Sequence, residues 1–462
     1  MRYTEFRESL KGKNIMVVGM GKSGKAATEV LAECGAVVTC QDASDASRMD
    51  SGFLKHLEEI GAKTCFGRIP EDLTGFDMLV LSPGVPSDLD YIREAEKAGA
   101  EIIGELELAY RLTPARFAAI TGTNGKTTTT TLTGEIFKAA GRKTHVVGNI
   151  GNPVVTDAVM AGPDDWMVTE VSSFQLETVR EFRPVVSAIL NLTPDHLNRH
   201  KTMEAYGNAK ANVAARQTED EYLVVNYDDP AVMALTSRSK AMVIPFSRKS
   251  VLDHGAYLDG TSIVIRDTDG SIHYICDKGD LRIIGDHNVE NVLAASAVCY
   301  FAGIDEEVIG KAVREFPGVE HRIEFCGRAG GVDYYNDSKG TNVDAAVIAI
   351  KALENNIILI AGGDGKSQDF TDLAEHLRDG VIALVLLGRD APVIEEAARK
   401  AGYENIYHCR DMEECVRKSS ELAREGDKVL LSPACASWDM YPNYEVRGRH
   451  FKQCVKDIIE IG

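Results

Sequence analysis

The sequence lacks several patterns that mark specialised classes of protein. Its ten cysteines are scattered and form no C-x-x-C pair, so neither a zinc knuckle nor a redox motif is indicated and reduced thiols are expected. No apolar run approaches the roughly 20 residues needed to cross a bilayer. No basic segment leads into an apolar one near the N-terminus, so we expect no secretory signal and a cytoplasmic location.

Positive charge is also scarce. The chain has 51 lysine and arginine residues against 70 aspartate and glutamate residues, a formal net charge of −19. This excess of acid argues against non-specific binding to nucleic acid or to anionic membranes. Any anionic ligand must therefore be held by local cations and backbone amides, which directs attention to phosphate-binding loops.

The 462 residues exceed the usual size of one domain and fall into three segments. Each segment opens with an apolar strand that runs into a glycine-rich or polar turn, and strand and helix signals then alternate, as in α/β folds with parallel sheets. We predict a Rossmann-like N-terminal domain, a central P-loop ATPase-like domain and a Rossmann-like C-terminal domain. The predicted boundaries are 1–103, 104–318 and 319–462, with a small antiparallel addition over 222–284.

The strongest motif follows the apolar strand Phe117–Ile120 and precedes a helix. Glycines there let backbone N–H groups wrap a phosphate chain, a lysine reaches the terminal phosphates, and the next hydroxyl can ligate Mg²⁺. Ile120 replaces the leading glycine of the usual P-loop pattern, and a chance Gly-Lys-Thr turn is the alternative. The context nevertheless favours ATP binding. The residues concerned are Gly122, Thr123, Asn124, Gly125, Lys126, Thr127 and Thr128.

Two features near the next strands could supply a metal site. Glu170 ends a strand beside the phosphate loop, where a carboxylate suits Mg²⁺, although a solvated strand end is the alternative. His196 and His200 have an i, i+4 spacing, but H-E-x-x-H is absent and Pro194 places the start of this stretch in a loop, so zinc is not expected. One of the pair could assist at a phosphate or metal site, or both could be surface histidines.

The first segment carries G-x-G-x-x-G at Gly19–Gly24 after an apolar strand, with Asp42 about 20 residues further on, as a Rossmann site requires. A lone match is weak evidence. The turn could bind NAD, bind another nucleotide diphosphate, or only close a strand–helix connection. A pyrophosphate of some kind is favoured because the glycines permit close backbone approach.

Four polar turns in the third segment could form a binding cleft opposite the phosphate loop. Any one of these turns could equally be an ordinary loop that is rich in turn-forming residues. Four of them at one sheet edge would be unusual and would favour a binding site. They are His321–Glu324, Asn336–Asn342, Gly362–Ser367 and Ser432–Asp439.

Taken together, these motifs resemble the Mur ligase family over nearly the whole chain. The phosphate loop is shared with folylpolyglutamate synthetases and indicates only the superfamily. The Ser432–Asp439 run is most similar to the members that add D-glutamate, and the Asp-Asn-Pro-Arg signature of diaminopimelate- and lysine-adding relatives is not seen. Asn124 stands where the L-alanine-adding members have histidine. Narrower similarities are Gly148–Gly151, Glu170–Glu177, Gly285–Asn288 with Asn291, and Asn336–Lys339.

The resemblance implies an ATP-dependent ligase of cytoplasmic peptidoglycan-precursor synthesis. ATP would phosphorylate the carboxylate of UDP-N-acetylmuramoyl-L-alanine, and the amine of D-glutamate would attack the acyl phosphate, releasing phosphate. Such chemistry needs neutralised phosphoryl oxygens and well-positioned substrates. ATP and Mg²⁺ are the implied cofactors, a monomer is expected, and neither nucleic acid nor membrane is an expected partner.

The resemblance also implies roles for individual residues. Lys126 would hold the terminal phosphates, and Thr127 and Glu170 would ligate one Mg²⁺. His196 and Lys210 would ligate a second Mg²⁺. Lys210 would be carbamylated for this role, so that its side chain offers an anionic oxygen in place of a cationic amine. Without the resemblance, the sequence indicates only that Lys210 is a surface lysine on a helix over 206–215. The implied nucleotide contacts are Asn288, Asn291, Arg322, Asp337 and Lys339.

The implied substrate contacts lie in the outer segments. The first domain would bind uridine diphosphate rather than NAD. After Asp42 this chain has Ala43-Ser44, whereas a D-glutamate-adding member of the family has a Thr-Arg pair there, so the residues that bind the uracil ring are not predicted. Closure of the domains would bring Lys366 toward the phosphate loop. The residues for the UDP substrate are Gly19, Met20, Gly21, Lys22, Ser23, Asp42, Ser82, Pro83, Gly84 and Asn149, and those for D-glutamate are Thr341, Lys366, Ser437 and Tyr444.

Two other interpretations compete with a D-glutamate ligase. Another ligase of the superfamily, such as a folylpolyglutamate synthetase, is disfavoured because that family lacks a leading domain with a glycine turn. A nicotinamide-dependent oxidoreductase or NTP-driven regulator built around the first glycine turn is disfavoured by the phosphate loop, by Glu170 and by the polar turns of the third segment.

Overall fold

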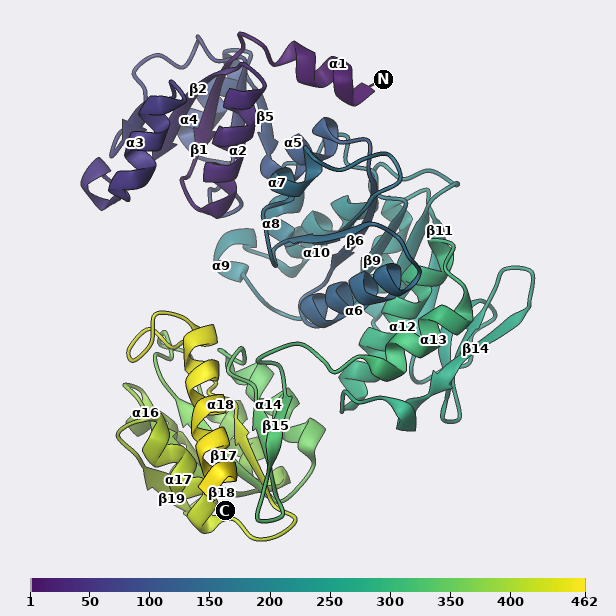
Figure 1. Ribbon diagram of the computed structural model, residues 1–462, viewed down its shortest axis with the longest axis vertical. Coiled ribbons are helices and arrows are strands. Elements are labelled where there is room, and N and C mark those ends of the chain that lie inside the picture. Colours follow the sequence, from purple (N-terminus) through teal and green to yellow (C-terminus); the bar gives the residue numbers. More distant parts are fainter. Residues whose placement is uncertain (1, 462) are drawn as a thin grey trace. The chain divides into compact units, whose positions relative to one another are not determined.

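The computed structural model describes residues 2–461 and divides into two compact units. The first unit comprises the residues up to Leu281 together with Val289–Phe316, and the second comprises Arg282–Asn288 and the residues from Pro317 onward. Sheets of five and nine strands lie in the first unit, and a sheet of six strands lies in the second (Figure 1). The predicted α/β class with parallel-rich sheets is confirmed.

The five-stranded sheet is parallel throughout, in the order β3-β2-β1-β4-β5. Strands β1 and β4 of this sheet are almost wholly apolar and buried, as expected of parallel strands covered on both faces. The register pairs Val18 of β1 with Gln41 and Leu81 on the two neighbouring strands, so the turns that follow these strands share one sheet edge. The elements are α1 (Arg2–Ser9), β1 (Asn14–Val18), α2 (Lys22–Glu33), β2 (Val37–Asp42), α3 (Ser51–Glu59), β3 (Lys63–Phe66), β4 (Met78–Leu81), α4 (Asp90–Lys97) and β5 (Glu101–Gly104).

The nine-stranded sheet has the order β14-β13-β12-β11-β10-β9-β6-β8-β7. The predicted antiparallel addition is only partly right, because β10 and β11 pair in parallel and only β12–β14 are antiparallel, all within this one sheet. A helix joins β10 to β11, as a parallel crossover requires, whereas Asp-Gly turns join the last three strands as hairpins. The strands are β6 (Arg116–Thr121), β7 (Thr144–Gly148), β8 (Trp166–Glu170), β9 (Val186–Ile189), β10 (Tyr222–Asn226), β11 (Met242–Ser247), β12 (Gly255–Asp259), β13 (Ser262–Arg266) and β14 (Ile272–Asp277).

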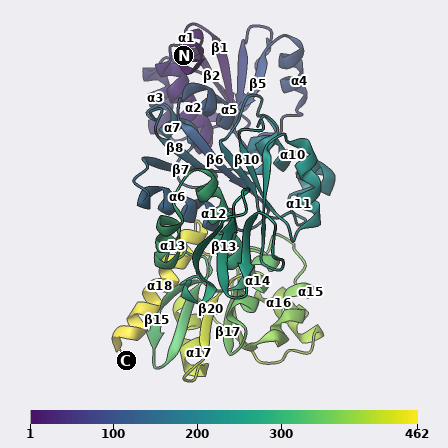
Figure 2. The ribbon, with the colours of Figure 1, turned by 90° about the vertical axis from the view of Figure 1, so that its right-hand side faces the viewer.

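Helices cover the nine-stranded sheet, and α6, which follows the phosphate loop, packs beside α13 in both views (Figures 1 and 2). Among the described residues, no helix is both long enough and apolar enough to span a membrane. The helices are α5 (Glu105–Leu112), α6 (Lys126–Ala139), α7 (Val154–Ala158), α8 (Ser173–Leu176), α9 (Leu197–His200), α10 (Met203–Ala211), α11 (Pro230–Leu235), α12 (Asp286–Phe301) and α13 (Glu306–Glu315).

The six-stranded sheet has the order β15-β16-β20-β17-β18-β19, and only β15 is antiparallel to its neighbour. Helix α18 packs along β15 and β16 (Figure 1). Parallel pairing of β16, β20 and β17 brings the polar turns that follow them to one sheet edge. The elements are β15 (Glu324–Ala329), β16 (Val332–Asn336), α14 (Val343–Leu353), β17 (Ile357–Gly362), α15 (Thr371–His376), β18 (Val381–Leu387), α16 (Ala391–Lys400), β19 (Ile406–His408), α17 (Met412–Leu422), β20 (Lys428–Leu431) and α18 (Tyr444–Ile461).

Candidate functional site

The loop between β6 and α6 has the shape of a phosphate-binding turn. Gly125 has a φ of 81°, a left-handed conformation that suits glycine, and a Cβ there would lie 2.2 Å from Asn291 Oδ1. Asn191 Oδ1 accepts hydrogen bonds from the backbone N–H groups of Thr123 and Asn124, at 3.0 and 2.8 Å. Asn191 therefore shapes this loop, a role that the sequence motif does not reveal.

Two lysines converge on one carbonyl of this loop. The Nζ atoms of Lys126 and Lys210 donate to Gly122 O at 2.9 and 2.7 Å, and Lys126 also donates to Thr123 O at 2.7 Å. Lys210 is only 1 % exposed, so the interpretation as a surface lysine is wrong. Burial, followed by the charge of Lys126, holds the pKa of Lys210 well below its ordinary value, against the opposing effect of two nearby carboxylates.

Glu170 lies beside the start of this loop because β8 pairs in parallel with β6, with Glu170 opposite Ile120. The residue is 2 % exposed, so it is not a solvated strand end. Its Oε1 accepts from Asn149 Nδ2 at 2.7 Å. Its Oε2 is buried and has no hydrogen-bond partner among residues 2–461. A buried, unpaired carboxylate oxygen of this kind fits a hard cation ligand.

The two histidines differ in environment. Burial lowers the pKa of His196, Asp195 opposes this effect, and the charges of Lys126 and Lys210 lower it further, so this half-exposed ring lies near both lysines. His200 is 8 % exposed, and its Nε2 lies 2.9 Å from a serine hydroxyl of α8. The interpretation of two surface histidines is therefore wrong for His200, which packs in the interior.

The glycine turn after β1 contacts the ends of two neighbouring strands. Asp42 Oδ2 accepts from Met20 N at 2.7 Å, and Ser82 Oγ donates to Gly19 O at 2.7 Å. Burial would raise the pKa of Asp42, but hydrogen bonds from the backbone of Met20 and from Ser44 lower it. Gly19, Met20, Asp42 and Ser82 are thus brought together. Gly21 precedes Lys22 and Ser23, which open α2 at the same turn.

Arg199 connects the second predicted substrate loop to the end of α8. Its guanidinium donates to the carbonyls of Pro83, Gly84 and Val85 at 3.4, 3.3 and 3.0 Å, and to Glu177 Oε2 at 2.6 Å. This residue was not among the predicted site residues, although it lies between His196 and His200. It fixes the 83–85 backbone relative to the loop that carries His196.

Glu105, the first residue of α5, is a buried acid that supports the loop carrying Asn149. Its Oε1 accepts from Val155 N at 2.7 Å, at the start of α7. Its Oε2 has no partner among the described residues. Burial raises the pKa of this carboxyl to about 7, against opposing hydrogen bonds from the α7 backbone. The folded chain therefore binds this proton more tightly than the unfolded chain does.

This shift predicts a pH-dependent stability. The stabilising contribution of protonated Glu105 is complete below its ordinary pKa of 4.5 and is lost as the pH rises through about 7. Glu105→Gln keeps the acceptor and cannot ionise, so we expect it to be more stable than wild type at pH 8, by up to roughly 3 kcal/mol, and nearly equal at pH 4. Calorimetric unfolding at both pH values measures this difference. If Glu105→Gln changed the free energy of unfolding by the same amount at both pH values, the predicted pH dependence would be contradicted.

The second unit brings three of the predicted nucleotide residues, Arg322, Asp337 and Lys339, to one edge of its sheet. Asp337, directly after β16, accepts from Ser432 Oγ at 2.6 Å. Burial raises the pKa of Asp337 to about 7, although Ser432 and Arg322 oppose the shift. Lys339 Nζ lies 5.7 Å from the ring centroid of Tyr444. Asp337, Arg322, Lys339 and Tyr444 are therefore neighbours within this unit.

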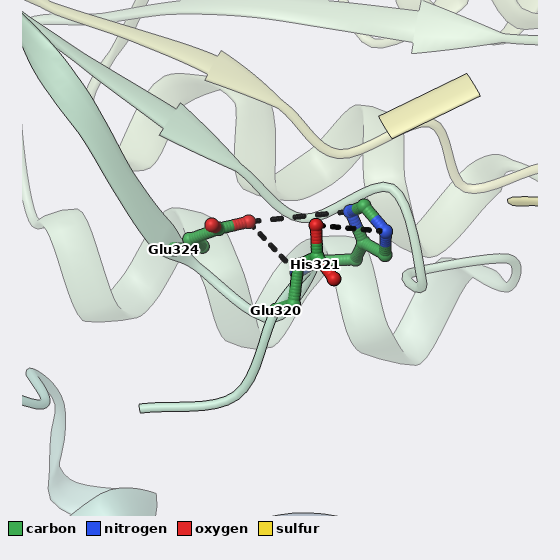
Figure 3. Close-up of side chains that lie close together, drawn as sticks. All are labelled: Glu320, His321 and Glu324. Atoms are coloured by element: carbon green, nitrogen blue, oxygen red, sulfur yellow. Dashed lines mark hydrogen bonds and ion pairs between the residues drawn. The ribbon is translucent and has the colours of Figure 1, made fainter. Parts of the chain in front are cut away.

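The turn that carries Arg322 is fixed by Glu320, His321 and Glu324 (Figure 3). Asn336 Oδ1 accepts from Ser338 N, so its Nδ2 donates to His321 Nδ1 at 2.8 Å. That hydrogen bond places the proton of the neutral His321 ring on Nε2.

Lys452 forms ion pairs with both of these glutamates. Although the donor atoms of Glu320, His321 and Glu324 are close enough together to hold a metal ion, neither nitrogen of the His321 ring offers a lone pair in this arrangement. The group anchors the turn rather than forming a metal site.

The predicted amino-acid residues share the same sheet edge. Asp364 and Ala436 exchange two backbone hydrogen bonds of 2.9 and 2.8 Å, which tie the turn after β17 to the turn after β20. These turns carry Lys366 and Ser437, and Thr341 N bonds to Lys339 O at 2.9 Å.

Arg447, another residue that the motifs did not indicate, ties two of these turns together. It is 2 % exposed and donates to Ser338 O and Cys435 O at 2.9 and 3.0 Å.

One pair of predicted residues is divided between the units. Asn291 belongs to the first unit, where its Oδ1 accepts from Thr129 Oγ1 at 3.2 Å, beside the phosphate loop. Asn288 belongs to the second unit, where its side chain donates to Ile284 O at 2.7 Å. Both lie on α12, three residues apart, so the helix carries a residue of each unit.

Family models match three parts of the chain. The first is described as Mur ligase MurD-like, N-terminal domain, and matches residues 13–104. The second, Mur ligase middle domain, matches residues 120–299. The third, Mur ligase, glutamate ligase domain, matches residues 321–435. The matches cover the phosphate loop and the polar turns of the last sheet as far as residue 435.

Similar sequences extend over almost the full length. The chain is 47 % identical to a UDP-N-acetylmuramoylalanine–D-glutamate ligase of Thermoanaerobacter sp. (strain X514) over 452 residues, 97 % of this chain and 99 % of that protein. It is 48 % identical to the protein of the same name from Clostridioides difficile (strain 630) over 451 residues, 97 % of this chain and 99 % of that protein. Among solved structures, MurF from Acinetobacter baumannii shares the fold, with a TM-score of 0.60, 18 % identity and coverage of 92 % and 91 %.

Proposed function

This chain belongs to the Mur ligase family, and on that basis we propose that it is the ligase that joins D-glutamate to UDP-N-acetylmuramoyl-L-alanine while ATP is converted to ADP and phosphate. The supporting observation is the cluster at the phosphate loop, where Lys126 and Lys210 meet at Gly122 O beside the unpaired Oε2 of Glu170. The similarity to D-glutamate ligases over nearly the whole chain supports the choice of amino acid. The three domains of the ligase would be residues 1–103, 104–318 and 319–462.

The residues around this loop fit Mg²⁺. Glu170 offers a buried carboxylate oxygen without a hydrogen-bond partner among residues 2–461, and Thr127 follows Lys126 in the first turn of α6. When bound there, Mg²⁺ would neutralise phosphoryl oxygens. The second predicted ion would be held by His196 and by Lys210 as a carbamate, which turns a buried cation next to Lys126 into an anionic oxygen ligand.

The remaining steps follow from the chain's own residues. The Lys126 ammonium, now bonded to two carbonyls of its loop, would exchange them for the terminal phosphates of ATP. The substrate carboxylate attacks the terminal phosphorus and ADP leaves. The amine of D-glutamate then attacks the acyl carbon, phosphate leaves, and the nitrogen releases one proton, so that an amide forms. Fixed donors at the transferring oxygens lower the barrier because they are oriented before reaction.

Substrates would be held at the edges of the outer sheets. The UDP moiety would lie at the glycine turn and at the 82–84 loop that Arg199 holds. Asn288, Asn291, Arg322, Asp337 and Lys339 would contact the nucleotide, and Thr341, Lys366, Ser437 and Tyr444 would hold D-glutamate. Since ATP and amino acid must meet at one carboxylate, we expect closure of the domains during turnover. We expect the enzyme to act as a cytoplasmic monomer.

Phosphate release tests this function. The purified chain is mixed with ATP, Mg²⁺ and UDP-N-acetylmuramoyl-L-alanine, and D-glutamate, L-glutamate, L-alanine and diaminopimelate are compared. We expect release with D-glutamate alone, and none when the UDP substrate is omitted. Phosphate release with another amino acid instead of D-glutamate would support the proposed ligase reaction but contradict the proposed specificity for D-glutamate. If none of the four amino acids caused phosphate release and the chain instead changed the absorbance of NADH, an oxidoreductase would be favoured.

A further inference from the structure

The chain has two tryptophans, and they lie in opposite environments. Trp166 in β8 is 2 % exposed, whereas Trp438 in the turn after β20 is 64 % exposed. An indole carries a large apolar surface whose burial would stabilise the fold. The exposed position of Trp438 is therefore not explained by packing and directs attention to what its ring contacts.

The ring of Trp438 lies beneath the ammonium of Lys366, with Nζ 4.5 Å from the ring centroid, a distance typical of cation–π contacts. The contact depends on the pairing of Asp364 with Ala436, which exchange two backbone hydrogen bonds. Lys366 and Trp438 each lie two residues beyond this pair. The aromatic contact therefore joins the tips of two turns whose bases are already tied.

The backbone of Lys366 is also constrained. Lys366 and Ser367 have φ values of 52° and 60°, a left-handed conformation that costs energy in residues other than glycine and clusters at functional sites. The carboxylate of Asp364 accepts from Lys366 N and pairs with Arg389 Nη1, each at 3.1 Å. Among the described residues, Lys366 forms no ion pair, so its charge faces the indole and solvent.

We propose that Trp438 is a positioning residue that holds the Lys366 ammonium toward a carboxylate of the incoming acidic amino acid. The inference rests on the proposed function and adds a residue to its amino-acid site. The face of the indole attracts the cation without neutralising it, so Lys366 stays available to a carboxylate. The ring also excludes water from one side of the resulting ion pair, which strengthens it.

Steady-state kinetics of Trp438→Leu tests this role. We expect the KM for D-glutamate to rise about 2- to 5-fold, as the loss of a cation–π contact at an exposed site predicts, with the KM values for ATP and the UDP substrate unchanged. Trp438→Phe keeps a π face and should show a smaller rise. In a Lys366→Met background, Trp438→Leu should add nothing, because the two substitutions remove one interaction.

Tyr407→Leu is the matched control. It removes a similar contact elsewhere in the same unit, where Lys418 Nζ lies 5.0 Å from the Tyr407 ring centroid, and its KM for D-glutamate should equal that of wild type. An unchanged KM for D-glutamate in Trp438→Leu, or an equal rise in the KM for ATP, would overturn the proposal. Failure of the proposed function is distinct, since wild type itself would then release no phosphate with D-glutamate.

Iodide quenching of tryptophan fluorescence should change on binding of D-glutamate only if Trp438 lies at the amino-acid site, and not if its role is purely structural. Iodide should quench the exposed Trp438 and spare the buried Trp166. Adding D-glutamate together with the UDP substrate and a non-hydrolysable ATP analogue should reduce this quenching in wild type and leave Trp438→Leu unaffected. Equal iodide quenching of wild type with and without D-glutamate would contradict direct shielding of the indole.

Discussion

Lys126→Ala should lose about 100- to 1000-fold or more in the rate of phosphate release, the scale expected when a preorganised donor to a transferring oxyanion is removed. The lysine opens α6, and its ammonium spans the carbonyls of Gly122 and Thr123 at 2.9 and 2.7 Å. These bonds hold the charge at the mouth of the loop. Without that charge, the loop keeps its backbone donors but lacks the cation that compensates the terminal phosphates.

The comparison needs a lysine of the same helix that is remote from the loop. Lys138, near the other end of α6, is half-exposed and pairs with Glu135 at 2.8 Å, so Lys138→Ala should retain wild-type turnover. Thermal unfolding of both variants shows whether the helix remains folded. Full activity in Lys126→Ala would remove the assignment of ATP to this loop, and a loss of activity only at low ATP would indicate binding without a role in the transition state.

The residues of the phosphate loop could be predicted because their signal is local. A strand, a glycine turn and a helix follow one another in the sequence, and that order predicts the loop without knowledge of any distant contact. Glu170 could be predicted for a related reason: parallel strands place their ends at one sheet edge, and β8 is the neighbour of β6. The chemical roles of these residues stay predictions.

Contacts between distant residues could not be predicted from local patterns. Asn191 shapes the phosphate loop from 67 and 68 residues away, and Arg199 reaches the 83–85 backbone across 114 to 116 residues. Arginine and asparagine in loops are ordinary surface residues by composition. Only the pairing of strands decides which of them acquire buried partners.

The same limit explains the antiparallel prediction over 222–284. Short β-rich runs separated by Asp-Gly turns favour hairpins, and β12–β14 form them. The prediction failed where α11 lies between β10 and β11, since a short helix of six residues was enough for a parallel crossover. Lys210 illustrates a different failure, because a lysine carries no local sign that its helix face will be buried.

Lys210→Ala should be nearly inactive and partly rescued by added formate, acetate or propionate. Lys210 is 1 % exposed, and its ammonium shares Gly122 O with Lys126, so two cations meet at one carbonyl. A carbamate reverses one of these charges and supplies an oxygen ligand. In the alanine variant, the missing side chain leaves space beside the loop in which a small carboxylate can place an oxygen at the same position.

Two controls separate this explanation from general damage. The same carboxylates should not rescue Lys126→Ala, which lacks a cation rather than a metal ligand. With ¹³C-labelled bicarbonate, wild type should show a carbamate carbon resonance that is missing in Lys210→Ala. Absence of both the resonance and the rescue, in a variant that unfolds as cooperatively as wild type, would exclude the carbamate. Lys210 would then act as an ammonium, with Gly122 O and the incoming phosphates as its partners.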